Sequence, residues 1–409
     1  MRSLKYISMA GIQMLCIITA KAQIPCDTIT GKICRSIVTD TAFNPYVTGV
    51  LGNWRANRSY TWYSARAETN PDAETDIRRN GTFADFAVFW NFQGDKLIAE
   101  PDTARWVWNS EITLINRKGF EIENKDPLGR YNAGLYGYNL TMPTAVIQNS
   151  RYRESAFEGF EDYGYITQIC DTGCAANRHI DYSSYKFKID TAQKHSGKSS
   201  IRLQPNEKVG LSFALTTVAQ DTNTARLQFN TKQESCVAGG IALTAIKSNN
   251  KILLPVFSPT KSARMVISAW VKENGSCNCT AYKTNHIIVA FSGGDSSSYT
   301  FSPTGNIIEG WQRYESVFDI PANNDLMTVS LSADTATVYF DDLRIHPFNA
   351  NMKSFVFHPV NLRLMAELDE NTYATFYEYD DDGTLIRLKK ETQRGVKTIK
   401  ETRSALLKE

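Results

Sequence analysis

Short stretches of alternating apolar and polar residues recur along residues 155 to 348, with turn residues between them. The clearest are residues 200–203, 209–215, 265–271, 286–291, 328–331 and 338–340. A period of two places successive side chains on opposite faces of a strand, and closely spaced short strands are typical of β-sandwiches. No long amphipathic helical pattern interrupts them. The sequence therefore predicts an all-β fold with a sandwich in this region.

Five motifs in this region share their order and spacing with a known class of module. Ser-Ala-Phe-Glu-Gly-Phe-Glu-Asp (155–162) opens the region and Val-Tyr-Phe-Asp-Asp-Leu-Arg-Ile (338–345) closes it. Between them lie His-Ser-Gly-Lys-Ser-Ser-Ile-Arg-Leu (195–203), Ile-Ser-Ala-Trp-Val (267–271) and Gly-Trp-Gln-Arg-Tyr-Glu-Ser-Val-Phe (310–318). Together they resemble jelly-roll carbohydrate-binding modules with a galactose-binding-like fold. The resemblance implies a jelly-roll β-sandwich that binds a glycan and catalyses nothing.

The resemblance also implies a structural calcium ion near the two ends of the module. Its ligands would be Glu161 and Asp342, with Asp341 as an alternate, and backbone oxygens near 195–197 could complete the shell. Calcium takes six to eight oxygen ligands, and the first and last strands of a jelly roll lie close together. The alternative is that these acids are solvated or paired with Arg344 and Lys198.

Sugar binding normally requires aromatic faces beside polar side chains. Mid-strand Trp270 lies between apolar neighbours, so we expect it to pack in a core rather than to form a ligand platform. Trp311 matches a Gly-Trp position of the resembled modules and is also expected to be structural. The other aromatic candidates are Tyr282, Tyr299 and Tyr314. The sequence leaves the glycan-binding residues unknown.

Residues 349–409 predict an antiparallel β-meander. Four strand-like runs, 362–368, 373–379, 384–388 and 396–400, are separated by turn-rich sequence, and Asp382-Gly383 is a strong hairpin signal. Residues 377–385 resemble the YD repeat of Rhs-type wall and toxin-shell proteins, and residues 116–130 carry a looser version of it. In that family the sheet continues, so the last strand here would leave an open edge or pair with another protein.

The N-terminus predicts export. Arg2 and Lys5 precede an apolar run, and Ala20-Lys-Ala22 fits a signal-peptidase site, so residues 1–22 would be a signal peptide. No later segment predicts a membrane span. The chain carries a net charge of +2 with no basic block, which argues against a nucleic-acid partner. In style it resembles secreted proteins of Bacteroidota, and we expect it at the cell surface, outside the cell or in the periplasm.

Export makes disulfides permissible, and seven cysteines follow the signal peptide. We favour pairing of Cys26 with Cys34, then of Cys170 with Cys174, while Cys236 could pair with Cys277 or Cys279. The spacings match no zinc finger or ribbon. An odd number leaves at least one thiol free or paired between chains.

No catalytic signature stands out. The chain lacks a Gly-x-Ser-x-Gly elbow, a His-Glu-x-x-His motif and a glycine-rich phosphate loop, and no pair of acids is marked for glycoside hydrolysis. The predicted organisation is a signal peptide (1–22), a mostly β region with a YD-like hairpin (23–154), the jelly roll (155–348) and the meander (349–409). We expect a non-enzymatic exported protein whose jelly roll binds a glycan or cell-surface polysaccharide. The alternative is a structural fragment of an Rhs-like surface assembly that binds no sugar.

Overall fold

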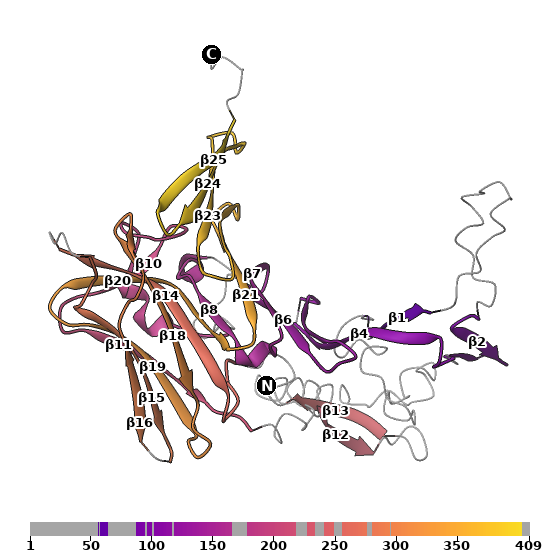
Figure 1. The fold of residues 1–409 in the computed structure, drawn as a ribbon. Coiled ribbons are helices and arrows are strands. Elements are labelled where there is room, and N and C mark those ends of the chain that lie inside the picture. The colour runs from indigo at the N-terminus through magenta and orange to yellow at the C-terminus, as the bar shows by residue number, and fades with distance from the viewer. Residues whose placement is uncertain are drawn as a thin grey trace, which may run out of the picture. The chain divides into compact units, whose positions relative to one another are not determined.

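The structure of the protein is a computed structural model, and the residues that it describes fall in two compact units (Figure 1). It describes residues 56, 58–63, 87–94, 96–99, 102–116, 118–165, 178–217, 227–233, 241–248, 256–275, 280–294 and 296–402. One unit comprises Met1–Arg55 and Ala225–Asn249, and its described part is the hairpin of β12 (Leu227–Gln233) and β13 (Ile241–Ser248). The other comprises Ala56–Thr224 and Asn250–Glu409, and all that follows concerns it. The expected signal peptide and all the cysteines considered above lie outside the described residues.

Strands and short 3-10 segments account for all the regular structure in the described residues, so the all-β prediction is confirmed. The 3-10 segments are η2 (Tyr152–Glu154), η3 (Asp162–Gly164) and η4 (Ser183–Lys188). β2 (Trp90–Gln93) and β3 (Lys96–Ala99) form a separate hairpin. Among the described residues, no helix has the length and apolar character needed to cross a membrane.

A ten-stranded antiparallel sheet joins the two ends of the unit. Its strand order is β1-β4-β5-β6-β7-β21-β22-β23-β24-β25. The first half contains β1 (Arg58–Trp62), β4 (Trp106–Ile115), β5 (Glu121–Lys125), β6 (Tyr131–Gly137) and β7 (Met142–Gln148). The second half contains β21 (Asn351–Phe357), β22 (Leu364–Leu368), β23 (Ala374–Tyr379), β24 (Leu385–Thr392) and β25 (Gly395–Glu401).

The two halves of this sheet meet where β7 pairs with β21. Asn351 lies opposite Gln148, and Ser354 lies opposite Ala145. In sequence, the whole sandwich lies between these two strands. The regions expected before and after the sandwich, 23–154 and 349–409, thus share one sheet in their described parts. The sandwich is inserted between two neighbouring strands of that sheet (Figure 1).

The inserted part is a sandwich of two antiparallel sheets. The larger has the order β17-β18-β14-β20-β10-β9, with β8 pairing with β20, and the smaller has the order β11-β19-β15-β16. The larger sheet contains β8 (Ala156–Glu158), β9 (Ile189–Asp190), β10 (Ser200–Leu203), β14 (Arg264–Asn274), β17 (Ile307–Ile308), β18 (Trp311–Asp319) and β20 (Thr337–Pro347). The smaller contains β11 (Lys208–Ala214), β15 (Asn285–Ser292), β16 (Ser297–Phe301) and β19 (Leu326–Ala333).

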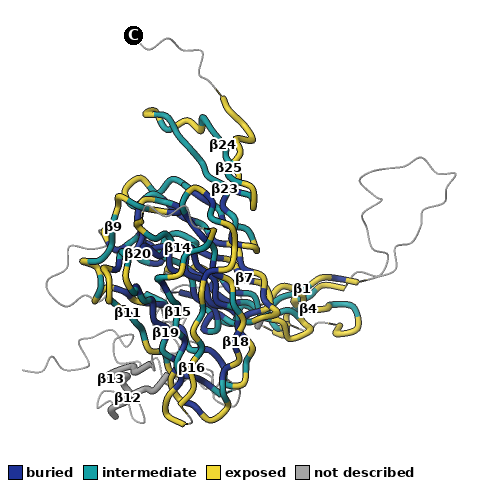
Figure 2. The backbone as a smooth tube through the Cα atoms, turned by 60° about the vertical axis from the view of Figure 1, so that its left-hand side comes forward, coloured by how far each residue is buried: buried dark blue, intermediate teal, exposed yellow. Residues whose placement is uncertain are grey.

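Period-two alternation builds the sandwich core. In β15, Ile287, Val289 and Phe291 are buried between the sheets, while the residues between them are partly exposed. β20 departs from this pattern because nine of its eleven residues are buried, and β14 departs from it over residues 267–271, which are all buried, so both faces are covered there (Figure 2). The second face of these strands is therefore covered by another part of the unit. The contacts described below show that the C-terminal half of the ten-stranded sheet, β21 to β25, covers it, and we call this half the C-terminal sheet.

Candidate functional site

The three acids predicted as calcium ligands lie around one segment of the chain, residues 195–199. Asp341 and Asp342 belong to β20 and are fully buried, and Glu161 precedes η3 and is almost fully buried. Oδ2 of Asp341 accepts the backbone N–H groups of residues 195 and 196 at 2.8 and 3.2 Å. Oε1 of Glu161 accepts those of residues 198 and 199 at 2.6 and 2.8 Å. The opening, middle and closing motifs of the sandwich therefore converge here.

Gly197 lets the chain pass close to Glu161. Its φ of 62° lies in the left-handed region, and a Cβ built on it would lie 2.2 Å from Oε1 of Glu161. Asp342 also adopts a left-handed backbone, at φ 51°. A side chain at position 197 would displace the Glu161 carboxylate from the amides that it accepts, so the glycine is required for the contact.

The three acids do not form ion pairs with Lys198 or Arg344, although such pairing was the alternative to a calcium site. Lys198 contacts Glu161 through its backbone N–H, and the guanidinium of Arg344 donates to backbone carbonyls of the C-terminal sheet. In the described part of the chain, no lysine or arginine side chain forms an ion pair with Glu161, Asp341 or Asp342. Burial, together with Asp342 and Glu161, raises the pKa of Asp341 well above its usual range. Burial raises the pKa of Glu161 to about 8.

This arrangement provides some, but not all, of what a calcium ion needs. Oε2 of Glu161 is buried and has no hydrogen-bond partner, which is costly unless a cation or proton satisfies it. However, the described residues contain no group of three or more acidic, histidine or cysteine side chains placed to hold a metal. Calcium binding would therefore require Asp341 or Asp342 to turn an oxygen away from its present donors.

His195 connects this cluster to the C-terminal sheet. Its Nδ1 donates to Oδ2 of Asp342 at 2.8 Å, and its Nε2 lies 3.1 Å from Oε1 of Glu391 on β24. The imidazole stacks on the indole of Trp270 with 4.1 Å between ring centroids. Burial alone would lower the pKa of His195, but Glu391 and Asp342 outweigh it and raise the pKa to about 9. The imidazole is thus charged at neutral pH and bridges two buried carboxylates.

The outer face of the larger sandwich sheet carries aromatic residues that the C-terminal sheet covers. Trp270, Trp311 and Tyr339 form a buried cluster against which Tyr373 and Val396 pack. The indole Nε1 of Trp270 donates to the carbonyl oxygen of Thr372 at 3.0 Å. The expectation that Trp270 is buried is confirmed, but it packs beneath the C-terminal sheet and not inside the sandwich.

The other aromatic candidates also form no open platform. Trp311 is 5% exposed and Tyr314 is 1% exposed. Tyr282 and Tyr299 are half-buried against the sandwich core. None of the five candidates therefore presents a free ring face to a polysaccharide.

Arg344 adds a second buried polar contact between the sandwich and the C-terminal sheet. Its guanidinium donates to the carbonyl oxygens of Asp369 at 2.7 Å and Leu368 at 3.0 Å. Burial lowers the pKa of Arg344 to about 10. We call the contacts of His195, Trp270 and Arg344 with the C-terminal sheet the clamp.

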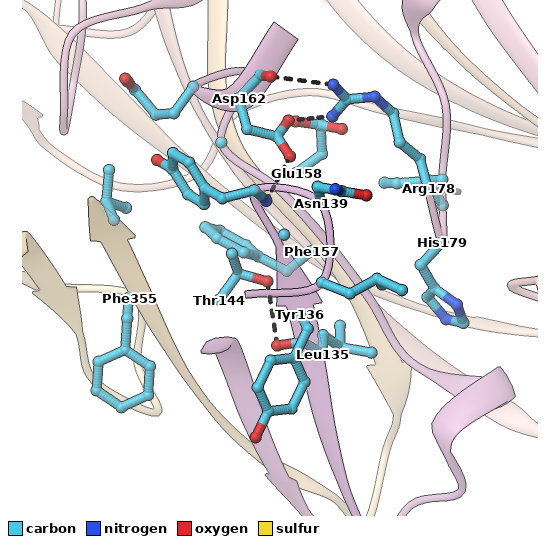
Figure 3. A pocket seen from close by; sticks show the side chains of 17 residues that line it. Leu135, Tyr136, Asn139, Thr144, Phe157, Glu158, Asp162, Arg178, His179 and Phe355 are labelled. Atoms are coloured by element: carbon cyan, nitrogen blue, oxygen red, sulfur yellow. Dashed lines mark hydrogen bonds and ion pairs between the residues drawn. The ribbon is translucent and has the colours of Figure 1, made fainter. Parts of the chain in front are cut away.

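A small pocket lies between the β6–β7 turn, β8 and β21 (Figure 3). Two of its acids are already engaged, because Glu158 accepts the hydroxyl of Tyr163 at 2.7 Å and Asp162 pairs with Arg178, and Glu161 also lines it. Burial raises the pKa of Glu158 to about 7. The cavity is about 70 Å³, less than half of the roughly 150 Å³ that accommodates benzene, so a sugar ring does not fit.

A larger pocket of about 370 Å³ lies where the sandwich meets the C-terminal sheet, and we call it the seam pocket. On the sandwich side it is lined by the loop at 304–306, by Ile308 and Arg313, and by Trp270. On the C-terminal side it is lined by Tyr373 and Gln393. No carboxylate lines it. Sequence reasoning missed this site because its walls come from strands and loops that are distant from one another in the chain.

Comparisons with known proteins give likenesses to carbohydrate-binding modules. No family model and no curated protein matches the chain. Among solved structures, a family 16 carbohydrate-binding module is 14% identical, with 38% of this chain and 82% of that chain covered and a TM-score of 0.21. A family 61 module in complex with β-1,4-galactotriose is 12% identical, with 39% and 80% covered and a TM-score of 0.20. The C-terminal family 22 module of Clostridium thermocellum Xyn10B is 10% identical, with 39% and 80% covered and a TM-score of 0.20. At these TM-scores the likeness carries no information about the ligand of this chain.

Proposed function

We propose that this protein is a non-enzymatic, exported glycan-binding protein of the cell surface, extracellular space or periplasm. The observation that carries the proposal is the seam pocket, which combines an aromatic ring with amide, hydroxyl and guanidinium groups in a space of about 370 Å³. Ligand pockets commonly measure about 300–1,000 Å³ and pair apolar surface with a few placed polar groups. The motifs that resemble those of carbohydrate-binding modules converge on residues 195–199, which also supports a glycan-binding function.

Binding without catalysis fits the disposition of the acids. Glycoside hydrolysis uses two carboxyl groups about 5 to 9.5 Å apart on either side of the bond that breaks. The lining of the seam pocket contains no carboxylate, and the acids of the 195–199 cluster are buried outside it. A glycan in the seam pocket would therefore meet hydrogen-bond donors and an aromatic ring, but no acid–base pair.

We also propose that a calcium ion supports this fold at Glu161 and Asp342, with Asp341 as the alternate ligand. The free Oε2 of Glu161 and the gathering of three buried carboxyl groups around one segment support the proposal. The ion would neutralise these carboxylates and hold segment 195–199 in place. It would act on the fold and would not touch the glycan, because the cluster is buried.

The alternative, an Rhs-like structural fragment, depends on pairing at the outer edge of β25, which no other described strand covers. That edge carries Lys397 and Lys400, and a register shift between β24 and β25 leaves Ile399 without a cross-strand partner, as in a β-bulge. Edge lysines and bulges are devices by which natural sheets discourage further strand pairing. These features favour the glycan-binding proposal over the structural one.

The test is binding of the purified mature chain to an array of soluble and insoluble polysaccharides, with calcium and with chelator. Saturable retention on one glycan class, with no release of reducing sugar, would support the proposal. A folded chain that is retained on no glycan would reject it and would redirect the search to protein partners of β25.

A further inference from the structure

We propose that the seam pocket binds one or two neutral sugar rings, held jointly by the sandwich and the C-terminal sheet. This inference rests on the proposed function and assigns its site. The key side chains are Asn306 and Arg313 from the sandwich and Tyr373 and Gln393 from the C-terminal sheet. Neither part alone contains the site.

The walls of the pocket are already connected by polar contacts. The side-chain amide of Asn306 donates to the carbonyl oxygen of Gln393 at 3.4 Å. Nε of Arg313 donates to the hydroxyl of Thr372 at 2.8 Å, and its guanidinium lies over the ring of Tyr373, 5.4 Å from the centroid. The pocket therefore spans a junction whose two sides have a fixed separation.

The chemistry of the lining matches a polyhydroxylated ring. Asn306 and Gln393 are exposed side-chain amides, and each can donate and accept, which suits neighbouring sugar hydroxyls. Tyr373 is half-exposed and offers an aromatic surface for the C–H groups of a sugar. Arg313 is the one charged residue in the lining, and its guanidinium forms an ion pair with Glu315. Because that charge is compensated, we assign the ligand as neutral.

The clamp makes this pocket preorganised. Trp270 lines the pocket while its indole N–H is held by Thr372, the residue before Tyr373. The His195 bridge holds Glu391, two residues before Gln393. A ligand that enters such a site loses little free energy in ordering the protein, so a small number of polar contacts suffices. Since the ligand touches both sides, its binding would also stabilise the docked arrangement.

The experiment uses the full mature chain and isothermal titration with short neutral oligosaccharides of the cello, xylo, manno and galacto series, with oligogalacturonate as the anionic probe. We expect Asn306→Ala and Gln393→Ala each to raise the Kd of the bound neutral probe about tenfold, as expected for lost hydrogen bonds, and Tyr373→Leu to raise it further. Asn323→Ala is the matched control, because Asn323 is an exposed amide outside the pocket. Its Kd should equal that of the wild type.

Each other outcome is decisive. Unchanged affinity in the pocket variants, with binding by the wild type intact, would overturn this site and leave the proposed function standing. Tighter binding of oligogalacturonate than of any neutral probe would overturn the neutral assignment. No binding of any probe or polysaccharide by the folded wild type would overturn both the site and the function. Asn306 and Gln393 are exposed, so thermal unfolding should confirm that their variants remain folded.

Discussion

His195 and Glu391 are 196 residues apart in sequence, yet Nε2 of the histidine lies 3.1 Å from the glutamate carboxylate in the buried junction between the sandwich and the C-terminal sheet. Oε2 of Glu391 also accepts the backbone N–H of Ala374 at 3.0 Å. One carboxylate on β24 therefore satisfies a charged donor from the sandwich and a backbone donor from β23. This places Glu391 among the residues on which docking of the two parts depends most.

Glu391→Ala should destabilise the protein strongly. It leaves the His195 imidazolium with Asp342 alone and leaves the amide of Ala374 without its acceptor. Removing one partner of a buried charge pair costs about 3 kcal/mol or more in free energy of unfolding. The control is Glu378→Ala, because Glu378 pairs with Arg387 and Lys389 in the same sheet at 35% side-chain exposure. Exposed pairs contribute about 1 kcal/mol or less, so urea unfolding should separate the two variants. Similar losses would show that the bridge is unimportant.

Gly197→Ala should cost more than another glycine substitution with the same backbone requirement. Gly197 and Gly129 both have positive φ, so alanine is strained at either position by roughly 1–2 kcal/mol. At Gly129 a Cβ would meet nothing within 4 Å, whereas at Gly197 it would overlap Glu161. We expect Gly197→Ala to lose about 1–3 kcal/mol beyond the Gly129→Ala loss, measured by chemical denaturation. Equal losses would mean that the Glu161 contact adds nothing.

Glu158→Gln should change how stability depends on pH. Burial raises the pKa of Glu158 to about 7, against a usual value near 4.3 in an unfolded chain. Between these values the folded state holds a proton that the unfolded state has released, so the contribution of Glu158 to stability falls as pH rises through this window. The groups that face it are Tyr163, Arg178 and Asp162.

The measurable quantity is the free energy of unfolding of the wild type minus that of Glu158→Gln. It should decrease from pH 5 to pH 7.5 by at most on the order of 3 kcal/mol, because glutamine cannot titrate. Denaturation series at several pH values provide it. A difference that stays constant over this range would contradict the raised pKa.

Calcium should raise the thermal midpoint of the wild type and leave that of Glu161→Gln unchanged. A ligand that binds only the folded state adds roughly 2.7 kcal/mol at one hundred times its Kd. Glu158→Gln is the matched control, since Glu158 is a buried carboxylate three residues before Glu161 that is satisfied by Tyr163 and the amide of Phe160. It should keep the calcium response. A wild type that responds to neither calcium nor chelator would reject the calcium site.

The sandwich could be predicted from the sequence because apolar and polar residues alternate within its individual strands. Strands such as β15 place every second side chain in the core, so the pattern predicts both the strand and its buried face. The same logic, applied to β14, points Met265, Ile267 and Val271 inward and Trp270 outward. The sequence does not say what covers an outward tryptophan, because the covering residues lie about 100 positions later in the chain.

The site was only partly predictable for the same reason. Glu161, Asp342 and the alternate Asp341 were identified because each belongs to a motif, and the motifs converge on residues 195–199. Glu391 had no local signal that distinguished it from other acids. β21 went unpredicted as a strand, and its pairing with β7 spans about 200 residues that the alternation of neither strand encodes. The seam pocket follows from that pairing, so it could not be inferred before the sheet was known.

The pairing of β7 with β21 has a consequence for synthesis of the chain on the ribosome. β1 and β4 to β7 emerge first and form a half-sheet whose last strand lacks a neighbour on one side until some 200 further residues have been translated. An unpaired strand edge of this kind is prone to join with other chains. If the sandwich folds as it emerges, its first and last strands, β8 and β20, pair and bring the ends of the insertion together. That shortens the loop that β21 must close and lowers its entropic cost. Mutations that slow folding of the sandwich should therefore appear first as aggregation of nascent chains, even where the finished protein is stable.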